Sequence, residues 1–407
     1  MRRSRSWAGV AGAILAVALA VALVVSAVAG RFPLWLRSAP GPSSSPAAAG
    51  AGTASPRPTG QPTPSPQLPA LSPQQMAGQR VIYSYGGLQP PATLLRLIRH
   101  GEVGGVIFFG PNVSSVPQLA HVIAELDQAN ASPLNPVRAP LLLMTDQEGG
   151  LVRRLPGAPL LSERQIGESA DPAAAAASAG SSAGLNLRGV GINVNLAPVL
   201  DVYRQPGDFD DQFQRSYSMN PAVVAELGAG FISAQQGEGV AATAKHFPGL
   251  GAAAQQQDTD LRPVTLTVPL ATLRAVDELP YRAAITAGVQ LVMVSWAVYP
   301  ALDPGRPAGL SPAIVGGELR QRLGFTGVTI TDALEAGSLR AYGTFGHRAL
   351  LAAEAGMDLI LCSQQDVGEG EQAAAGLEAG YGNGQLGQPA FLAALQRVLA
   401  LRASLAG

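Results

Sequence analysis

Residues 141–150, LLLMTDQEGG, are the stretch of sequence that decides the fold. The stretch begins with apolar and β-branched residues, as a buried strand does, and it then runs directly into Asp146, Gln147 and Glu148 before a Gly-Gly turn. Polar residues that begin where a strand ends are typical of the carboxyl edge of a (β/α)8 barrel, which is where its active sites lie. This pattern therefore predicts a barrel with a polar site at its mouth.

The same alternation recurs from residue 75 onward, where short apolar or β-branched runs are separated by Ala/Leu-rich segments with helical periodicity. Eight such runs occur, at residues 80–85, 104–109, 141–145, 191–196, 242–245, 290–295, 327–331 and 357–362. Helices are expected between them, for example at residues 116–130, 221–238 and 270–287. The count of eight βα units predicts a TIM-type barrel over residues 74–407. A doubly wound sheet is the alternative, but no glycine-rich dinucleotide-binding turn follows the first run.

The N-terminal part of the chain has a different composition. Three arginines, at positions 2, 3 and 5, precede a charge-free apolar run at residues 7–30, which is long enough to span a bilayer as one helix. Residues 1–30 are therefore predicted to be a signal-anchor, or a signal peptide cleaved after Ala29. Residues 31–73, rich in Pro, Ala and Ser, are predicted to be a disordered linker. We expect an exported protein, anchored on the extracytoplasmic face of a membrane or secreted if cleaved.

Composition excludes several classes of partner and site. The formal net charge is −1 and no long basic run is present, so nucleic acid is not an expected partner. Cys362 is the only cysteine, which excludes an intrachain disulfide and a cysteine-based metal cluster. The four histidines are scattered, and three of them, His100, His121 and His347, lie in contexts that indicate structural roles. No metal or other cofactor is predicted.

Asp332 directly follows the seventh run, in VTITDALEAG, so its carboxylate is expected at the barrel mouth. Such a rigidly held carboxylate suits the nucleophile of a retaining glycosidase, which also needs a second group to protonate the leaving oxygen. The alternative is that Asp332 caps a helix beginning at Ala333.

Other polar residues offer donors and acceptors for sugar hydroxyls. Asp146 and Arg154 are separated by a glycine turn that would return Arg154 to the same pocket. Lys245, the only lysine in the chain, adjoins His246, and burying both is costly unless a ligand or a carboxylate pairs them. Arg215 is expected to point toward the same face.

Glu148 and Arg153 lie in the same motif as Asp146 and Arg154 but are not assigned to sugar binding. They are expected to form a surface or loop-stabilising pair.

Six motifs in order, VGGVIFFGPNV, DQEGGLVRRL, GINVNLAPVLDV, QRSYS, KHFPGLG and TDALEAG, resemble glycoside hydrolase family 3, and in particular its single-barrel β-N-acetylglucosaminidase (β-N-acetylhexosaminidase) branch. The resemblance runs from about residue 72 to the C-terminus. It implies a (β/α)8 barrel, retaining hydrolysis without a metal, and a substrate with a terminal β-linked N-acetylhexosamine. By motif, it implies that Asp332 is the nucleophile and that the sugar is bound by Asp146, Arg154, Arg215, Lys245 and His246.

The chain departs from the family pattern at two places. Leu151 stands where members commonly have Arg. The loop after KHFPG, which in that branch carries an Asp-x-His pair with His as the acid/base, reads LGAAAQQQDTD and holds no histidine. Asp260 or Asp258 would have to take over the proton transfer, because a carboxylic acid with a raised pKa is the usual acid/base of glycosidases.

The expected function is removal of terminal β-linked N-acetylglucosamine from cell-wall-derived or other glycans by a covalent glycosyl-enzyme on Asp332. One alternative is a catalytically weak or inactive sugar-binding module on the same barrel, and another is a β-glucosidase of the same family. The position of residues 250–262 discriminates between catalysis and binding, since catalysis needs Asp258 or Asp260 near Asp332.

Overall fold

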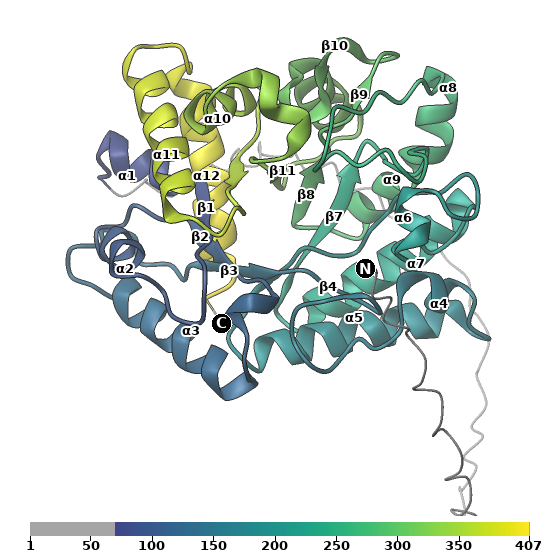
Figure 1. Ribbon diagram of the computed structural model, residues 1–407, viewed down its shortest axis with the longest axis horizontal. Helices are drawn as coiled ribbons and strands as arrows, with labels where there is room; N and C mark the ends of the chain where they lie inside the picture. Colours follow the sequence, from purple (N-terminus) through teal and green to yellow (C-terminus); the bar gives the residue numbers. More distant parts are fainter. Residues whose placement is uncertain (1–69, 407) are drawn as a thin grey trace, which may run out of the picture. The chain divides into compact units, whose positions relative to one another are not determined.

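Eight parallel strands close into a barrel in the computed structural model, which describes residues 70–406 (Figure 1). The order of the strands around the barrel is β1-β12-β11-β8-β7-β6-β3-β2. Each of the eight predicted runs contains or overlaps one strand, so the predicted TIM-type barrel is confirmed. The strands are β1 (Val81–Tyr83), β2 (Gly105–Ile107), β3 (Leu142–Thr145), β6 (Val194–Asn195), β7 (Ala241–Phe247), β8 (Leu291–Val294), β11 (Val328–Ala333) and β12 (Leu359–Leu361).

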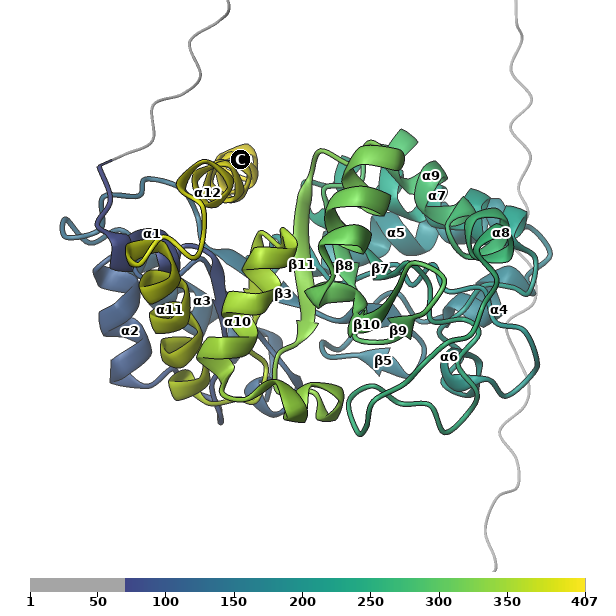
Figure 2. The ribbon, with the colours of Figure 1, turned by 90° about the horizontal axis from the view of Figure 1, so that it is seen from above.

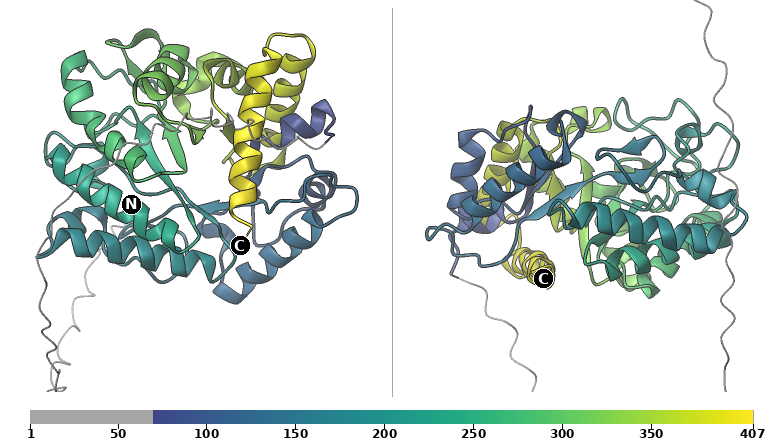
Figure 3. Two further views of the ribbon diagram at one scale, coloured as in Figure 1. Left: turned by 180° about the vertical axis from the view of Figure 1, so that it is seen from behind. Right: turned by 90° about the horizontal axis from the view of Figure 1, so that it is seen from below.

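Helices surround the strands, as Figures 1 and 3 show. Several start where the sequence supplies both a side-chain cap and a proline in the first turn, at Ser115, Asp171 and Asn220. The helices are α1 (Pro73–Gly78), α2 (Ala92–Arg99), α3 (Val116–Asn130), α4 (Glu163–Gly167), α5 (Pro172–Arg188), α6 (Phe209–Gln212), α7 (Pro221–Gly237), α8 (Leu270–Thr272), α9 (Leu279–Thr286), α10 (Phe345–Ala355), α11 (Val367–Gly382) and α12 (Gln388–Ser404).

The helix predicted at residues 270–287 is interrupted. It consists of α8, a π-helical turn at Leu273–Asp277, and α9. Pro280 has no N–H group, so a continuous α-helical hydrogen-bond ladder cannot pass through this position. Two short antiparallel hairpins were not predicted, β4 (Gln147–Gly149) with β5 (Val152–Arg153) and β9 (Val298–Tyr299) with β10 (Asp303–Pro307).

The inside of the barrel is an apolar core that is closed at one end. Side chains from all eight strands form this core together with Val398 and Leu401 of α12. Arg402 donates hydrogen bonds to the carbonyls of Ala139 and Pro140, which precede β3. Helix α12 therefore covers the amino ends of the strands, and it crosses that end in Figures 2 and 3. The carboxyl ends remain open for a site.

Among residues 70–406, no helix has both the length and the apolar character that a membrane span requires. The predicted signal-anchor or signal peptide at residues 1–30 lies outside the described residues, as does the predicted linker as far as residue 69. Both stay predictions.

Leu401→Ala tests the role of α12 in closing the barrel. The substitution leaves a void in a buried apolar cluster, so we expect the free energy of unfolding to fall by about 2–3 kcal/mol. Urea denaturation measures the change. The control is Leu185→Ala on α5, where the side chain is 49% exposed and the expected change is below about 0.5 kcal/mol. Equal unfolding free energies for the two variants would show that α12 does not close the core.

Candidate active site

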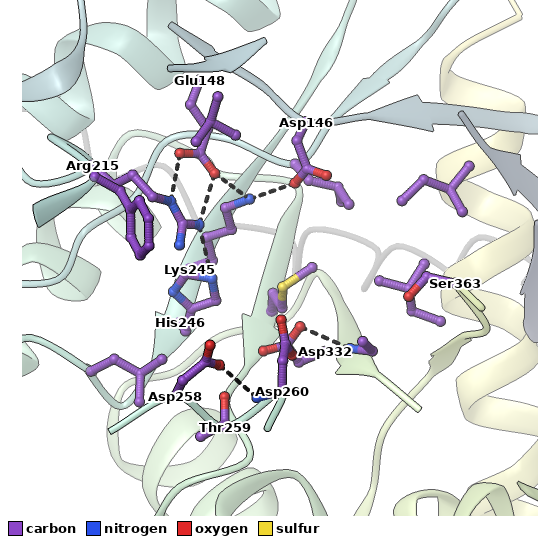
Figure 4. A pocket seen from close by; sticks show the side chains of 18 of the residues that line it. Asp146, Glu148, Arg215, Lys245, His246, Asp258, Thr259, Asp260, Asp332 and Ser363 are labelled. Atoms are coloured by element: carbon purple, nitrogen blue, oxygen red, sulfur yellow. Dashed lines mark hydrogen bonds and ion pairs between the residues drawn. The ribbon is translucent and has the colours of Figure 1, made fainter. Parts of the chain in front are cut away.

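A cavity of about 340 Å³ opens at the carboxyl ends of the strands (Figure 4). Its apolar floor includes Ile107, Leu196, Met293 and Leu361, which also belong to the core inside the barrel. Its polar lining contains all eight predicted site residues, which are Asp146, Arg154, Arg215, Lys245, His246, Asp258, Asp260 and Asp332. The fold therefore brings these residues together from six separate stretches of the chain.

Lys245, near the end of β7, is buried between two carboxylates. Its Nζ lies 2.8 Å from Asp146 Oδ1 and 2.8 Å from Glu148 Oε1, and the side chain is 2% exposed. Burial alone would lower the pKa of Lys245, but Asp146 and Glu148 outweigh it and raise that pKa above its ordinary value. Lys245, if buried, was expected from the sequence to need a ligand or a carboxylate to pair it, and Asp146 and Glu148 are these carboxylates.

Glu148 links Lys245 to Arg215. The Arg215 Nε and a terminal nitrogen donate to the two Glu148 oxygens over 2.8 and 2.9 Å, which is the bidentate geometry favoured by guanidinium and carboxylate. Burial would raise the pKa of Glu148, but Arg215 and Lys245 hold it far below its ordinary value. Glu148 is thus a permanent anion within the wall of the cavity.

The expected pairing of Glu148 with Arg153 is wrong. Arg153 instead donates to the carbonyls of Gly150 and Gly157, over 3.0 and 2.7 Å. Successive side chains of an extended segment alternate between its faces, so Asp146 and Glu148 point the same way. That two-residue spacing is the signal in the sequence that could have placed Glu148 in the site.

His246 is neutral in this setting. Its Nδ1 lies 2.8 Å from Asp201 Oδ2, and its Nε2 lies 3.5 Å from a terminal nitrogen of Arg215. Burial, reinforced by the positive charge of Arg215, lowers the pKa of His246 to about 4. The hydrogen-bond pattern assigns the ring proton to Nδ1, which donates to Asp201, while Nε2 faces the guanidinium as an acceptor.

Two buried carboxylates behind His246 were not assigned as site residues from the sequence. Burial raises the pKa of Asp201 to about 6, and burial together with Asp201 raises the pKa of Asp210 to about 7. Asp201, Asp210 and His246 place ligand-type atoms within 4.8 Å of one another, which is a spacing that suits a cation. Arg215 already contacts two of them, with 3.4 Å from its terminal nitrogen to Asp210 Oδ1. Its guanidinium supplies the positive charge there.

Asp146 and Arg154 are the partly exposed members of the polar wall. Their side chains are 15% and 34% exposed, and a terminal nitrogen of Arg154 lies 3.8 Å from Asp146 Oδ2. The Nε of Arg154 is buried and has no protein partner. The β4–β5 hairpin returns Arg154 to the cavity through Gly150, whose φ of 53° favours glycine. Leu151, at the tip of the hairpin, is 66% exposed and does not line the cavity.

Asp332 lies at the carboxyl end of β11, and its Oδ1 accepts a hydrogen bond from Ala333 N over 2.8 Å. Ala333 is still part of the strand, and the next helical turn is the 3-10 segment Gly337–Tyr342. The alternative that Asp332 caps a helix beginning at Ala333 is therefore wrong. Its carboxylate faces the cavity (Figure 4).

The loop of residues 250–262 folds over the mouth of the barrel. Asp258, Thr259 and Asp260 all line the cavity, and Figure 4 shows the Asp260 carboxylate beside Asp332. Asp258 Oδ1 accepts a hydrogen bond from Asp260 N over 2.8 Å. Asp260 is an exposed residue at the cavity mouth, but the protein around it and the charges of Asp332 and Asp258 raise its pKa to about 7. A loop that pointed to solvent would have favoured a binding module.

Comparisons with known proteins agree with this architecture. The family model described as the N-terminal domain of glycosyl hydrolase family 3 matches residues 74–401. An uncharacterized secreted glycosyl hydrolase of Arthroderma benhamiae is 46% identical over 81% of this chain and 93% of its own length. A β-hexosaminidase of Thioalkalivibrio sulfidiphilus is 35% identical over 70% of this chain and 79% of its own length.

A similar fold has also been solved. The family 3 β-N-acetylglucosaminidase of a Paenibacillus strain superposes with a TM-score of 0.77 at 35% identity, and covers 83% of this chain. This chain spans 63% of that longer protein. The chain belongs to glycosyl hydrolase family 3 and is a glycosidase that hydrolyses O-glycosyl bonds.

Proposed function

We propose that the protein is a retaining glycosidase that removes terminal β-linked N-acetylglucosamine from glycans, including cell-wall-derived chains. The observation that carries the proposal is the placement of Asp260, a carboxylic acid with a raised pKa, beside Asp332 in one cavity. The names of the β-hexosaminidase and β-N-acetylglucosaminidase relatives support the choice of sugar.

In the proposed reaction, Asp332 attacks the anomeric carbon while Asp260 gives its proton to the leaving oxygen. The bond between the anomeric carbon and that oxygen breaks, and a covalent glycosyl-enzyme forms on Asp332. Water then attacks the same carbon, Asp260 accepts a proton from it, and the ester to Asp332 breaks. Both carboxyl groups return to their starting states, as retaining hydrolysis requires.

The polar wall opposite these two carboxylates would hold the sugar ring. Asp146 offers acceptor oxygens and Arg154 an unpartnered Nε–H, both suited to hydroxyl groups. Lys245 and Arg215 lie behind or beside them and are fixed by ion pairs. His246 is fixed by its hydrogen bond to Asp201, so little reorganisation is needed when substrate binds. We assign sugar binding to all five residues on this basis.

The other readings make different use of the same cavity. A β-glucosidase would keep the two-carboxylate mechanism and differ only in the 2-substituent of the sugar. An inactive binding module would not need an acid beside Asp332, so the placement of Asp260 supports catalysis over binding.

Export of the protein is supported by the secreted relative from Arthroderma benhamiae. We propose that residues 1–30 direct this export, either as an uncleaved anchor or as a peptide removed after Ala29. Residues 31–73 would then separate the barrel from the membrane surface or form the start of the secreted chain.

Asp332→Asn should abolish turnover because an amide cannot form the glycosyl-enzyme. We expect kcat to fall by at least about a thousandfold, which corresponds to about 4 kcal/mol. Release of nitrophenol from a nitrophenyl β-N-acetylglucosaminide measures it. Asp171→Asn, which keeps the cap at the start of α5, is the matched control and should retain full activity. Turnover by Asp332→Asn at the wild-type rate would exclude Asp332 as the nucleophile.

Asp260→Ala should slow cleavage most for substrates whose leaving group must be protonated as it departs. With a sugar or methyl leaving group, we expect kcat/KM to fall by about 10²–10⁴-fold. With a dinitrophenyl leaving group, which departs without protonation, the loss should be much smaller. The comparison variant is Asp258→Ala. If Asp258→Ala shows this dependence on leaving group and Asp260→Ala does not, Asp258 is the acid.

The pH dependence follows from the same group. Partial desolvation by the surrounding loop and the carboxylates of Asp332 and Asp258 raise the pKa of the exposed Asp260 from 3.8 to about 7. Because the protonated form is the active acid, kcat/KM should fall as the pH rises through about 7. Asp260→Ala should lose this basic limb in its residual activity on a methyl or sugar glycoside, because only these leaving groups need the proton. An unchanged basic limb in that variant would assign the limb to another group.

A further inference from the structure

The loop that carries Asp258 and Asp260 is attached to the rest of the barrel on both sides of the cavity. On one side it is bound to α6, where Phe209 N donates to the carbonyl of Ala253 and the side-chain amide of Gln212 donates to the carbonyl of Gln255, both over 2.9 Å. These bonds fix the first half of the loop.

The second half is bound to the segment that follows the nucleophile. The carbonyl of Asp260 accepts a hydrogen bond from Gly337 N over 2.7 Å, and the carbonyl of Thr259 accepts one from Ser338 N over 3.1 Å. Gly337 belongs to the same TDALEAG motif as Asp332, a few residues farther along the chain. The backbone of the acid and that of the nucleophile are thus joined through one short segment.

This attachment requires glycine at position 337. A Cβ atom there would overlap the carbonyl of Leu261 and would lie 2.8 Å from the carbonyl oxygen of Asp260. Real Cβ atoms do not approach other heavy atoms this closely, and the obstacles are backbone atoms that no rotamer change can remove. Any other residue would push the loop away from its place.

We propose that Gly337 is a positioning residue for the general acid. By lacking a Cβ atom, it lets the loop dock on the segment behind Asp332, so the separation of the two catalytic carboxylates is set by the folded backbone. The inference rests on the proposed function, in which Asp260 is the acid. Retaining glycosidases need that separation near 5–5.5 Å, and a misplacement of about 1 Å can cost about a hundredfold in rate.

Gly337→Ala tests the proposal. The measurement is kcat/KM for glycosides with sugar or methyl leaving groups, compared with kcat/KM for a dinitrophenyl glycoside. A displaced acid should lower kcat/KM for a sugar or methyl leaving group by about a hundredfold, and for a dinitrophenyl leaving group by less than about threefold. Asp260→Ala gives the reference pattern for complete loss of the acid. A merely structural defect would lower both values together, since it would disturb Asp332 and the sugar wall as well.

The matched control is Gly230→Ala in α7, where an added Cβ meets no atom within 4 Å. It should keep both kcat/KM values and the wild-type unfolding midpoint. If Gly337→Ala does not fold, Ser338→Pro provides a second route. It removes the N–H that binds Thr259, together with the buried Ser338 hydroxyl, at a position in the first turn of a 3-10 segment where proline is tolerated. It should show the same leaving-group pattern with a smaller amplitude.

The outcomes separate this inference from the function on which it rests. If the wild-type protein cleaves neither glycoside, the proposed function fails. If the wild type cleaves both and Gly337→Ala keeps the wild-type ratio of the two kcat/KM values, the positioning role alone is overturned. A parallel loss on both glycosides by a folded Gly337→Ala overturns it as well.

Discussion

The buried ammonium of Lys245 is the interaction on which the rest of the site depends. An unpaired charge inside a barrel is too costly to keep, so Lys245 requires the two carboxylates of Asp146 and Glu148. Glu148 then needs a further cation to balance it, and Arg215 provides this bidentate partner. Arg215 in turn contacts His246, and the network ties β3 and the loop around α6 to β7.

This network divides the cavity into two regions of different charge. On one wall, cations and anions neutralise one another, and the groups left facing the open space are neutral or paired, which suits sugar hydroxyls. On the other wall, Asp332, Asp258 and Asp260 line the cavity and form no ion pair with another described residue (Figure 4). The mutual repulsion of these three carboxylates is therefore not compensated by a cation, and it favours the protonated form of Asp260 that the proposed acid needs.

Most of the fold was visible in the sequence because its cause is local. Strands buried on both faces read as apolar runs, and the polar residues that end them mark the barrel mouth. Residues of the site that depend on long-range contacts were less visible. Asp210 enters through the short helix α6, and the loop of Asp260 is placed by bonds to Gly337 and Ser338, far along the chain. Glu148 was assigned to the wrong pair, although its spacing to Asp146 could have placed it in the site, because hairpin β4–β5 had not been predicted.

A carboxylic acid in place of the histidine that the family resemblance implies would have a physical consequence for the proposed cycle. A histidine acid would be charged when protonated and would be attracted to Asp332, whereas a carboxylic acid holds its proton because Asp332 is negative. When Asp332 becomes an ester, that negative charge disappears and the pKa of Asp260 should fall. Asp260 has by then given up its proton, so it enters the second step as the carboxylate that must activate water. In this arrangement, ester formation on Asp332 favours the change of Asp260 from general acid to general base.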